Sequence, residues 1–373
     1  MADPTPSARP ARVLILSAGI GAGHDRPALT LARQIEEERP GTHVEIVDTL
    51  EEIGPHAVAV VEENTRATIY DPKRYWLFDL QYRLWYHAPV RWLVQAGSVL
   101  LGGRALHRAA RRTRATVIVS VYPGATEILG ALRRLRRLPA PAVAAITDLS
   151  SLRYWAARGI DLHLVTHPES IAEVRQIAGP GPVAAVHGFS PPEFRSPVDR
   201  DGARARLGLP ATGPVVVVSG GGWAIGDLSG AVACAREQGA FVVALCGHAE
   251  EIRTRLAAEF AGDGRVRVEG FTEQMCDLLT AADALVHSTA GLTILEARLR
   301  GCRPISYGWG VAHIRVNNEA FARYGLAEVA TSRAELSAAL ASALASPLPP
   351  DTSLDGVPSA ASLVLALSDA ASA

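Results

Sequence analysis

Three glycine-rich segments of the chain could each hold a phosphate group. They are Gly19-Ile-Gly-Ala-Gly-His24, Gly220-Gly-Gly222 and Ser288-Thr-Ala-Gly291, and each follows a short apolar run. A glycine loop between a buried strand and a helix leaves backbone N–H groups exposed, and the positive end of the helix dipole adds to their attraction for anions. No Gly-Lys-Ser/Thr sequence follows the second segment, so we do not expect ATP hydrolysis of the P-loop type.

His24 is the residue of the first segment whose side chain could do chemistry. We expect it at the junction of loop and helix, where an imidazole with a pKa near the working pH can act as a general base. A surface histidine at a helix start is the alternative. The segment also partly matches the Gly-x-Gly-x-x-Gly dinucleotide fingerprint, with Asp48 as a ribose ligand, although its third glycine is out of register. A further alternative is that these glycines only permit a tight turn.

Glu296 is the corresponding residue of the third segment. Gly291 opens a predicted helix, and side chains in a helix lean toward its N-terminus. A carboxylate one turn into that helix can therefore reach back to the glycine loop and accept hydrogen bonds from both hydroxyls of a ribose. The spacing predicts a nucleotide pocket at residues 288–296.

Strands and helices alternate around these segments. In each half of the chain, a glycine segment separates a short apolar strand from a helix, and a second strand follows. The expected elements are strands at 13–16, 44–47, 215–218, 241–245 and 284–287, and helices at 28–38, 227–238 and 275–282. Pro27 fits the first turn of the first of these helices. Such alternation is typical of parallel sheets covered by helices on both faces. Two such starts, at residues 13 and 215, predict an α/β chain with two doubly wound domains.

The length of 373 residues suits two domains of ordinary size. Prolines and turn-forming residues cluster at 188–212, where we place the linker. The predicted divisions are an N-terminal domain at 12–190, a C-terminal domain at 212–345 and a tail at 346–373. A helix near 360–371 in the tail is expected to pack back on the N-terminal domain. Asp199-Arg-Asp201 lies in the linker, and we interpret it as a helix start without a bound metal.

Composition excludes several classes of protein. Apolar residues make up 48% of the chain and charged residues 20%, which excludes a disordered protein. The longest apolar candidate, Trp92–Gly103, is too short to span a membrane, and residues 1–12 lack the apolar core of a signal peptide. The spacing of the four cysteines fits no metal or redox motif, so we expect buried small side chains in a reducing cytosol. These residues are Cys234, Cys246, Cys276 and Cys302.

Residues 66–137 carry most of the positive charge. They hold 14 basic and 3 acidic side chains. The aromatic residues interleaved with them are Tyr75, Trp76, Phe78, Tyr82, Trp85, Tyr86 and Trp92. Basic residues beside Trp and Tyr suit the anionic surface of a bilayer, and a solvated face is the alternative. No helix-turn-helix, zinc-finger or RNA-binding motif accompanies the segment, so we do not expect nucleic acid as a partner.

The motifs together resemble those of the GT-B glycosyltransferases. The residues of the C-terminal motifs are Gly270, Phe271, Met275, Ala282, Asp283, Gly291, Thr293, Glu296, Gly301, Pro304, Asn317 and Gly325. The N-terminal and middle motifs are Gly21-Ala-Gly23-His24, Gly220–Gly222 and Ile146-Thr-Asp148 with Trp155 and Asp161. The chain is most similar to the branch that contains monogalactosyldiacylglycerol synthases, processive diacylglycerol glucosyltransferases and the lipid II-forming N-acetylglucosaminyltransferase.

The resemblance implies an inverting transfer of a hexose or N-acetylhexosamine from a UDP-sugar to a hydroxyl of a lipid acceptor. The two Rossmann-like domains of this fold face each other across a cleft. The family holds the donor diphosphate without a metal, so no cofactor is expected. A diacylglycerol-like acceptor together with segment 66–137 predicts a cytoplasmic enzyme, peripheral on the inner face of the plasma membrane. The alternatives are a transferase of a soluble or natural-product acceptor, a UDP-sugar epimerase and a non-catalytic nucleotide-sugar-binding protein.

The resemblance also implies roles for single residues. His24 is expected to be the base, and Asp148 is the rival candidate for the base or for stabilising the oxocarbenium charge. Glu296 is expected to bind the ribose, and Phe271 to flank the uracil. Gly21 and Gly23 are expected to form the acceptor loop. The other expected donor-binding residues are Gly220, Gly221, Gly222, Met275, Ala290, Gly291, Leu292, Thr293, His313 and Asn317.

Two positions depart from the pattern of this branch. Leu152 stands where relatives commonly carry a histidine, and His313 stands where they commonly carry a glutamine. These departures leave the identity of the acceptor and of the donor sugar open.

Overall fold

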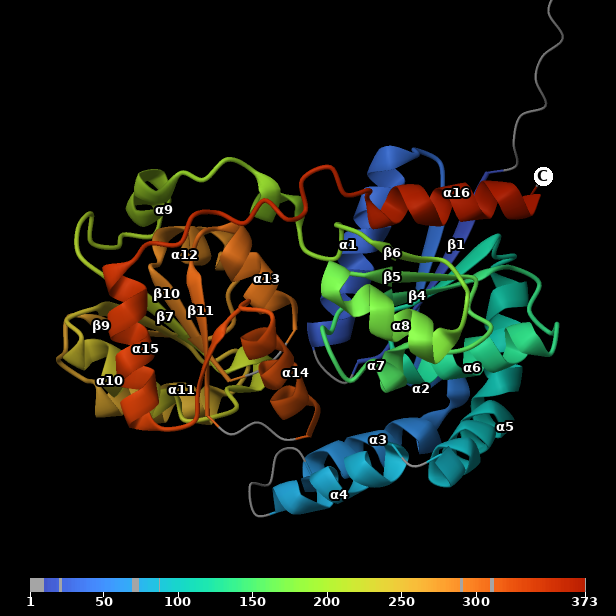
Figure 1. The fold of residues 1–373 in the computed structure, drawn as a ribbon, viewed down its shortest axis with the longest axis horizontal. Helices are drawn as coiled ribbons and strands as arrows, with labels where there is room; N and C mark the ends of the chain where they lie inside the picture. Colours follow the sequence, from blue (N-terminus) through green and yellow to red (C-terminus); the bar gives the residue numbers. More distant parts are fainter. Residues whose placement is uncertain are drawn as a thin grey trace, which may run out of the picture. The chain divides into compact units, whose positions relative to one another are not determined.

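The computed structural model describes residues 10–19, 22–68, 74–86, 88–288, 291–308 and 312–372. The chain divides into two units, each with its own parallel sheet (Figure 1). Unit 1 comprises Met1–Pro191 and Gly356–Ala373, and unit 2 comprises Pro192–Asp355. The chain therefore passes between the units twice.

Unit 1 is built on six parallel strands in the order β2-β1-β3-β4-β5-β6. The strands are β1 (Arg12–Ser17), β2 (His43–Asp48), β3 (Val117–Ser120), β4 (Ala142–Ile146), β5 (Leu162–Val165) and β6 (Val183–Ala185). Every side chain of β3 and β4 is buried. This explains why these strands are continuous apolar runs and do not alternate with polar residues.

The helices of unit 1 include one from the C-terminus of the chain. They are α1 (Ala22–Glu38), α2 (Thr49–Ile53), α3 (Pro55–Thr68), α4 (Tyr75–Tyr86), α5 (Ala88–Arg112), α6 (Pro123–Arg134), α7 (Leu152–Trp155), α8 (Ile171–Ala178) and α16 (Ala360–Ser372). α16 lies beside α1 (Figure 1). Arg39 forms an ion pair with Asp369 at 2.7 Å, and the hydroxyl oxygens of Thr116 and Ser368 are 2.6 Å apart. These contacts hold the last helix of the chain on unit 1.

The connection between β2 and β3 departs from the usual doubly wound pattern. A Rossmann sheet usually has a third strand beside the second, in the order 3-2-1-4-5-6. Here residues 49–68, 74–86 and 88–112 form α2 to α5, and no strand occurs in them. β2 is consequently the edge of the sheet, while α3 and α4 lie side by side away from it (Figure 1).

Unit 2 keeps the usual order of a Rossmann sheet. Its strands follow one another as β12-β11-β10-β7-β8-β9, which is the order 3-2-1-4-5-6 counted from the opposite edge. The strands are β7 (Val215–Ser219), β8 (Phe241–Leu245), β9 (Val266–Glu269), β10 (Ala284–His287), β11 (Arg303–Tyr307) and β12 (Glu328–Ala330). The helices are α9 (Arg200–Arg206), α10 (Leu228–Glu237), α11 (Glu250–Glu259), α12 (Met275–Ala281), α13 (Leu292–Leu299), α14 (Ala312–Arg323) and α15 (Arg333–Ala345). The predicted pair of doubly wound α/β sheets is confirmed.

One aspartate forms hydrogen bonds at the amino end of each sheet. Asp161, just before β5, accepts hydrogen bonds from Arg133 and from the first N–H of β4 at 2.6–2.7 Å. Asp283, just before β10, accepts from Arg204 at 3.2 Å and from the first N–H of β7 at 2.8 Å. Both aspartates belong to the motifs that carry the family resemblance. Their role is structural, at the end of the sheet opposite the glycine loops.

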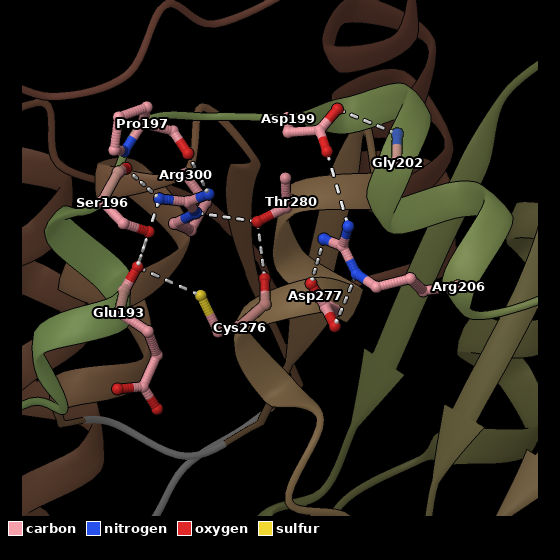
Figure 2. A network of polar contacts seen from close by, with 10 residues as sticks. All are labelled: Glu193, Ser196, Pro197, Asp199, Gly202, Arg206, Cys276, Asp277, Thr280 and Arg300. Carbon is pink, nitrogen blue, oxygen red and sulfur yellow. Dashed lines mark hydrogen bonds and ion pairs between the residues drawn. The ribbon is translucent and has the colours of Figure 1, made fainter.

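Arg300 anchors the first residues of unit 2 (Figure 2). Its buried guanidinium donates to the Thr280 hydroxyl on α12 at 2.7 Å and to the Ser196 carbonyl at 2.6 Å. Longer bonds of 3.4 Å reach the carbonyls of Glu193, Phe194 and Pro197. The Cys276 thiol donates to one of these carbonyls as well. Of the four cysteines, only this one is partly exposed, and the other three are buried as expected.

Residues 192–206, inside the stretch where we placed the linker, are thus ordered parts of unit 2. They form the 3₁₀ turn η3 (Pro192–Arg195) and α9. Asp199 begins α9 as expected, because its carboxylate accepts from the N–H of Gly202 at 2.9 Å (Figure 2). Arg206 at the other end of α9 pairs with Asp277 on α12 at 2.7 Å.

We expect Arg300→Met to lower the free energy of unfolding of unit 2 by about 3 kcal/mol. The substitution leaves the buried carbonyl of Phe194 and three partly buried carbonyl groups without a charged donor, and such bonds contribute about 1.5–3 kcal/mol each. Thermal unfolding followed by circular dichroism would measure the loss. The exposed Arg255 on α11 offers a control, for which Arg255→Met should change stability by no more than about 0.5 kcal/mol. Equal effects of the two variants would contradict the anchoring role.

Candidate active site

The glycine loops lie at the switch points of the two sheets, where the order of the strands reverses. The switch point of unit 1 lies between β1 and β3, and that of unit 2 lies between β7 and β10. Loops on the two sides of such a point diverge and leave a crevice at the carboxyl ends of the strands, which is the usual ligand position in these sheets. The loops after β1, β7 and β10 are the three glycine segments of the sequence.

His24 lies in the first turn of α1, and its ring reaches across the switch point of unit 1. Its Nδ1 atom is 2.9 Å from the carbonyl oxygen of Val121, which follows β3. Because a carbonyl only accepts, Nδ1 carries the hydrogen and the neutral ring keeps its lone pair on Nε2. The ring also packs against Tyr122 and Trp155, with centroids 5.5 and 5.7 Å away. Burial lowers the pKa of His24 below its ordinary 6.5, while the Val121 carbonyl and nearby carboxylates oppose the shift.

The start of α1 differs from the sequence prediction. The helix begins at Ala22, ahead of the predicted start at Ala28, and Pro27 lies inside it. We expected the proline to mark the first turn, since its missing N–H is tolerated there. In the structure, the missing N–H of Pro27 lies beyond the first turn of α1. His24 is therefore held by helical backbone, and the next residue, Asp25, accepts a hydrogen bond from the Ser17 hydroxyl at 2.6 Å.

Asp148 lies in the loop after β4, close to His24. Its Oδ2 atom accepts a hydrogen bond of 2.9 Å from the indole nitrogen of Trp155, the same buried ring that packs on His24. The structure thus brings the two catalytic candidates to one place around a shared tryptophan. Leu152, at the position of the histidine in relatives, is fully buried in the hydrophobic core of unit 1.

The carboxylate of Asp48 accepts backbone hydrogen bonds and is not available to a ribose. One of its carboxylate oxygens accepts from the N–H groups of Leu50 and Glu51, at 2.7 and 3.0 Å, as the N-cap of α2. The other accepts from the N–H of Gly19 at 2.5 Å. The alternative of a dinucleotide-binding oxidoreductase, which requires this carboxylate, is therefore not supported by the geometry.

The glycine loop after β7 forms a closed 3₁₀ turn, η4 (Gly221–Trp223). The Gly220 carbonyl accepts from the N–H of Ile225 at 2.9 Å. A Cβ atom on Gly220 would lie 2.5 Å from the backbone at the end of the same turn, so only glycine fits there. The Gly222 carbonyl accepts from the N–H of His248 at 2.7 Å. The three predicted glycines thus form one compact loop tied to the loop after β8.

Gly291 is the N-cap of α13, the helix after the third glycine segment. Its φ of +121° is a conformation that other residues rarely adopt. Leu292 and Thr293 supply the first backbone N–H groups of the helix, which by geometry have no acceptor within it. Glu296 follows one turn later, and its side chain is only 8% exposed. The N-terminus of α13 and a buried carboxylate therefore lie within one turn of each other.

An aromatic shelf in unit 2 includes two residues that were not predicted from the sequence. The rings of His248 and Phe271 stack at 4.6 Å, nearly parallel, and Trp223 lies 6.1 Å from His248. The two outer rings, Trp223 and Phe271, are each about half exposed. Trp223 directly follows the glycine loop, and His248 follows a glycine at the end of β8. Both positions repeat the pattern of a strand, a glycine and a large ring that singled out His24.

The remaining predicted donor-binding residues vary in their surroundings. Met275 and Leu292 are partly buried and pack against the hydrophobic core of unit 2. Asn317 on α14 is fully buried. The backbone of His313 lies in α14, but its side chain, like Gly21 and Ala290, lies outside the described residues. Gly23 is an exposed residue of the first turn of α1.

Large apolar side chains are exposed on the helices between β2 and β3, and we refer to them together as the exposed apolar face. The large side chains exposed there are Val60 on α3, Trp76, Leu80 and Leu84 on α4, and Trp92, Leu93, Leu100 and Leu101 on α5. Exposed arginines accompany them at positions 74, 83, 104 and 108. Tyr82 differs from the interpretation of the sequence, because its hydroxyl is 2.7 Å from that of Ser151. Among the described residues, no helix is both long and apolar enough to cross a bilayer.

Sequence comparison links the chain to glycolipid-forming enzymes. Residues 24–182 match the family described as monogalactosyldiacylglycerol (MGDG) synthase. The chain is 18% identical over 302 residues to a processive diacylglycerol beta-glucosyltransferase of Staphylococcus epidermidis, and the alignment covers 79% of this chain and 75% of that protein.

Comparison with solved structures concerns the fold. MurG of Acinetobacter baumannii superposes with a TM-score of 0.55 at 16% identity, covering 97% of this chain and 95% of that one. UGT89C1 of Arabidopsis thaliana, solved in complex with UDP, superposes with a TM-score of 0.58 at 13% identity, covering 98% and 100%. At such low identity these similarities establish a common fold.

Proposed function

We propose that the chain is an inverting hexosyltransferase. The premise is that it has the GT-B fold and resembles the diacylglycerol glycosyltransferase branch. It moves a hexose or N-acetylhexosamine from a UDP-sugar to a hydroxyl group of a lipid acceptor. The observation that carries the proposal is the pair of switch-point sites, one holding His24 and the other leading to Glu296. A dinucleotide enzyme would need Asp48, which caps α2 instead.

The donor is assigned to unit 2 on electrostatic grounds. The N-terminus of α13 and the glycine loop after β7 offer backbone N–H groups to a diphosphate, so we propose that no metal is needed. Glu296 accepts hydrogen bonds from the ribose hydroxyls. The aromatic shelf of Trp223, His248 and Phe271 suits a planar base. The resemblance of the donor-binding motif to that of the glycosyltransferase branch supports a uridine nucleotide as the donor group.

The acceptor is assigned to unit 1, where His24 acts as the base. The acceptor oxygen attacks the anomeric carbon as the bond from that carbon to the UDP oxygen breaks, and one displacement inverts the configuration. The acceptor proton passes to Nε2 of His24, because Nδ1 already carries the hydrogen donated to Val121. The imidazolium that forms is stabilised by the negative charge of Asp148. General base catalysis of this kind typically contributes about 10²–10⁴-fold.

The membrane surface is assigned to the exposed apolar face of α3 to α5. A lipid acceptor must be taken from a bilayer, and this face combines exposed tryptophans and leucines with exposed arginines. Each basic residue near an anionic membrane contributes about 1 kcal/mol, and burial of a leucine side chain contributes about 1.5–3 kcal/mol. We therefore propose a peripheral enzyme on the anionic inner face of the plasma membrane.

Vesicle flotation tests this surface. We expect the protein to float with phosphatidylglycerol vesicles and more weakly with phosphatidylcholine vesicles. Replacement of Leu100 and Leu101 together by serine should weaken binding by at least about 10-fold, because both side chains are almost fully exposed and lose their contact with lipid.

The matched control is Val198→Ser, which changes an exposed apolar side chain of unit 2 that belongs to none of α3, α4 and α5. It should leave flotation unchanged. Equal binding to both kinds of vesicle, or equal loss in the control, would contradict the assignment. Release of UDP from a panel of UDP-sugars, with diacylglycerol present in the vesicles, tests the transfer reaction itself.

A further inference from the structure

Tyr82 joins the exposed apolar face of α4 to the loop that carries Asp148. Its hydroxyl is 2.7 Å from the hydroxyl of Ser151, which is the N-cap of α7. Its ring stacks on Tyr154 with centroids 5.2 Å apart and an interplanar angle of 24°. Tyr82 therefore contacts the short helix α7 at its N-cap and near its end.

We propose that Tyr82 is a positioning residue for the transfer reaction, which holds α7 so that Trp155 keeps Asp148 and His24 in place. The proposal rests on the function proposed above and adds a residue that lies in none of the family motifs. It assigns Tyr82 to the acceptor side of the reaction and gives it no direct contact with either substrate.

The chain of contacts from Tyr82 to the base is short. α7 has four residues, and it ends with Trp155. The indole of Trp155 donates to Asp148 at 2.9 Å and packs on the ring of His24 at 5.7 Å. One turn of helix thus carries both the residue that Tyr82 holds and the residue that orders the two catalytic candidates.

The backbone of this loop requires such support. Ser151 has a φ of +60°, in the left-handed region, which non-glycine residues adopt only when their surroundings stabilise it. Its hydroxyl gains the bond with Tyr82, and its N–H donates to Ser150 at 2.6 Å. Loss of the Tyr82 hydroxyl removes one of the contacts that keep this conformation.

Tyr82 and the exposed apolar side chains of α4 lie on opposite sides of this helix. Each residue advances about 100° around a helix, so Trp76, Leu80 and Leu84 follow one side. Tyr82 is two residues from both leucines, about 160° around from each. A lipid surface that binds the exposed side of α4 therefore contacts the same helix whose other side contacts the catalytic loop.

The test compares Tyr82→Phe with Gln81→Ala. Gln81 is the neighbouring residue of α4, but its side chain bonds Asn64 of α3 at 3.1 Å and does not reach the catalytic loop. Transfer is measured with UDP-glucose and UDP-galactose onto dioleoylglycerol in phosphatidylglycerol vesicles. We expect Tyr82→Phe to lower kcat about 10-fold, in line with one lost hydrogen bond, and to leave KM for the donor and vesicle flotation unchanged. Gln81→Ala should stay within about 2-fold of wild type.

A double-mutant cycle tests the same bond from its other partner. Ser151→Ala should also lower kcat about 10-fold, and the double variant should be no slower than either single variant, because both remove one interaction. Additive losses, a rise in donor KM in place of a fall in kcat, loss of flotation, or an equal effect of Gln81→Ala would each overturn the proposal.

A second readout does not depend on transfer. Proton NMR titration of His24, assigned by its absence in His24→Ala, should give a pKa below 6.5 in wild type. In Tyr82→Phe the pKa should rise toward 6.5, because a loosened Trp155 buries the ring less. The charged groups that face the ring, Asp148 and Asp25, are common to both proteins. An unchanged titration would overturn the proposal, whereas absence of transfer by the wild type would overturn only the proposed function.

Discussion

His24→Ala is expected to lose transfer activity by about 10²–10⁴-fold, because the acceptor hydroxyl then has no base to receive its proton. UDP binding should be unchanged, since the donor residues lie in unit 2. Steady-state transfer and isothermal titration calorimetry with UDP would measure the two effects separately. A variant that lost transfer and UDP affinity together would contradict the assignment of His24 to the acceptor side.

The pH profile and Asp148→Asn separate the two catalytic candidates. Because burial depresses the pKa of His24, the neutral base persists below the ordinary value of 6.5, and wild-type kcat/KM should begin to fall only at more acidic pH. In Asp148→Asn the favourable charge is removed, so the pKa of His24 falls further and the acidic limb of the profile moves to lower pH. If Asp148 were the base, this variant would instead lose the limb and as much activity as His24→Ala.

Glu296→Ala is expected to weaken UDP binding by at least about 10²-fold. Two hydrogen bonds between a buried carboxylate and the ribose hydroxyls are lost, and bonds to charged groups contribute about 1.5–3 kcal/mol each. Isothermal titration calorimetry with UDP gives the affinity directly. Transfer at saturating donor should fall much less than in His24→Ala, because the base is intact.

The matched control for Glu296 is a change in the ligand. Wild type should bind 2′-deoxy-UDP more weakly than UDP, because one hydroxyl partner of the carboxylate is missing. Glu296→Ala should bind the two nucleotides with equal affinity. An unchanged UDP affinity, or a preference for UDP that persists in the variant, would show that the ribose site lies elsewhere.

The strands were the most predictable part of the fold. β8 and β10 begin and end at the predicted residues, because a strand buried on both faces of a parallel sheet is a short, nearly continuous apolar run. The loops that follow such strands must lie at one edge of the sheet. The glycine segments could therefore be placed at the carboxyl ends of their strands from spacing alone, whereas their position at the switch points follows from the strand order of the structure.

Contacts between distant segments could not be predicted in this way. Pro27 indicated a helix start, but the helix begins earlier in the structure. Arg300 binds the segment that precedes α9, so residues 192–206 belong to unit 2 although they are rich in turn formers. Tyr82 was grouped with membrane-facing aromatics by composition, but the fold places it against Ser151, a residue 69 positions later. Trp223 and His248 approach each other only because β7 and β8 are neighbours.

The unusual connection after β2 also bears on how this architecture can diversify. α3 and α4 occupy the part of the chain where a third strand would otherwise follow β2, so they form an appendage and do not belong to the ladder of paired strands. Such an appendage can be lengthened, shortened or exchanged between homologues without altering any strand register. Under the proposed function, the exchange of this one insertion alters the surface assigned to the membrane and leaves the unit assigned to the nucleotide unchanged.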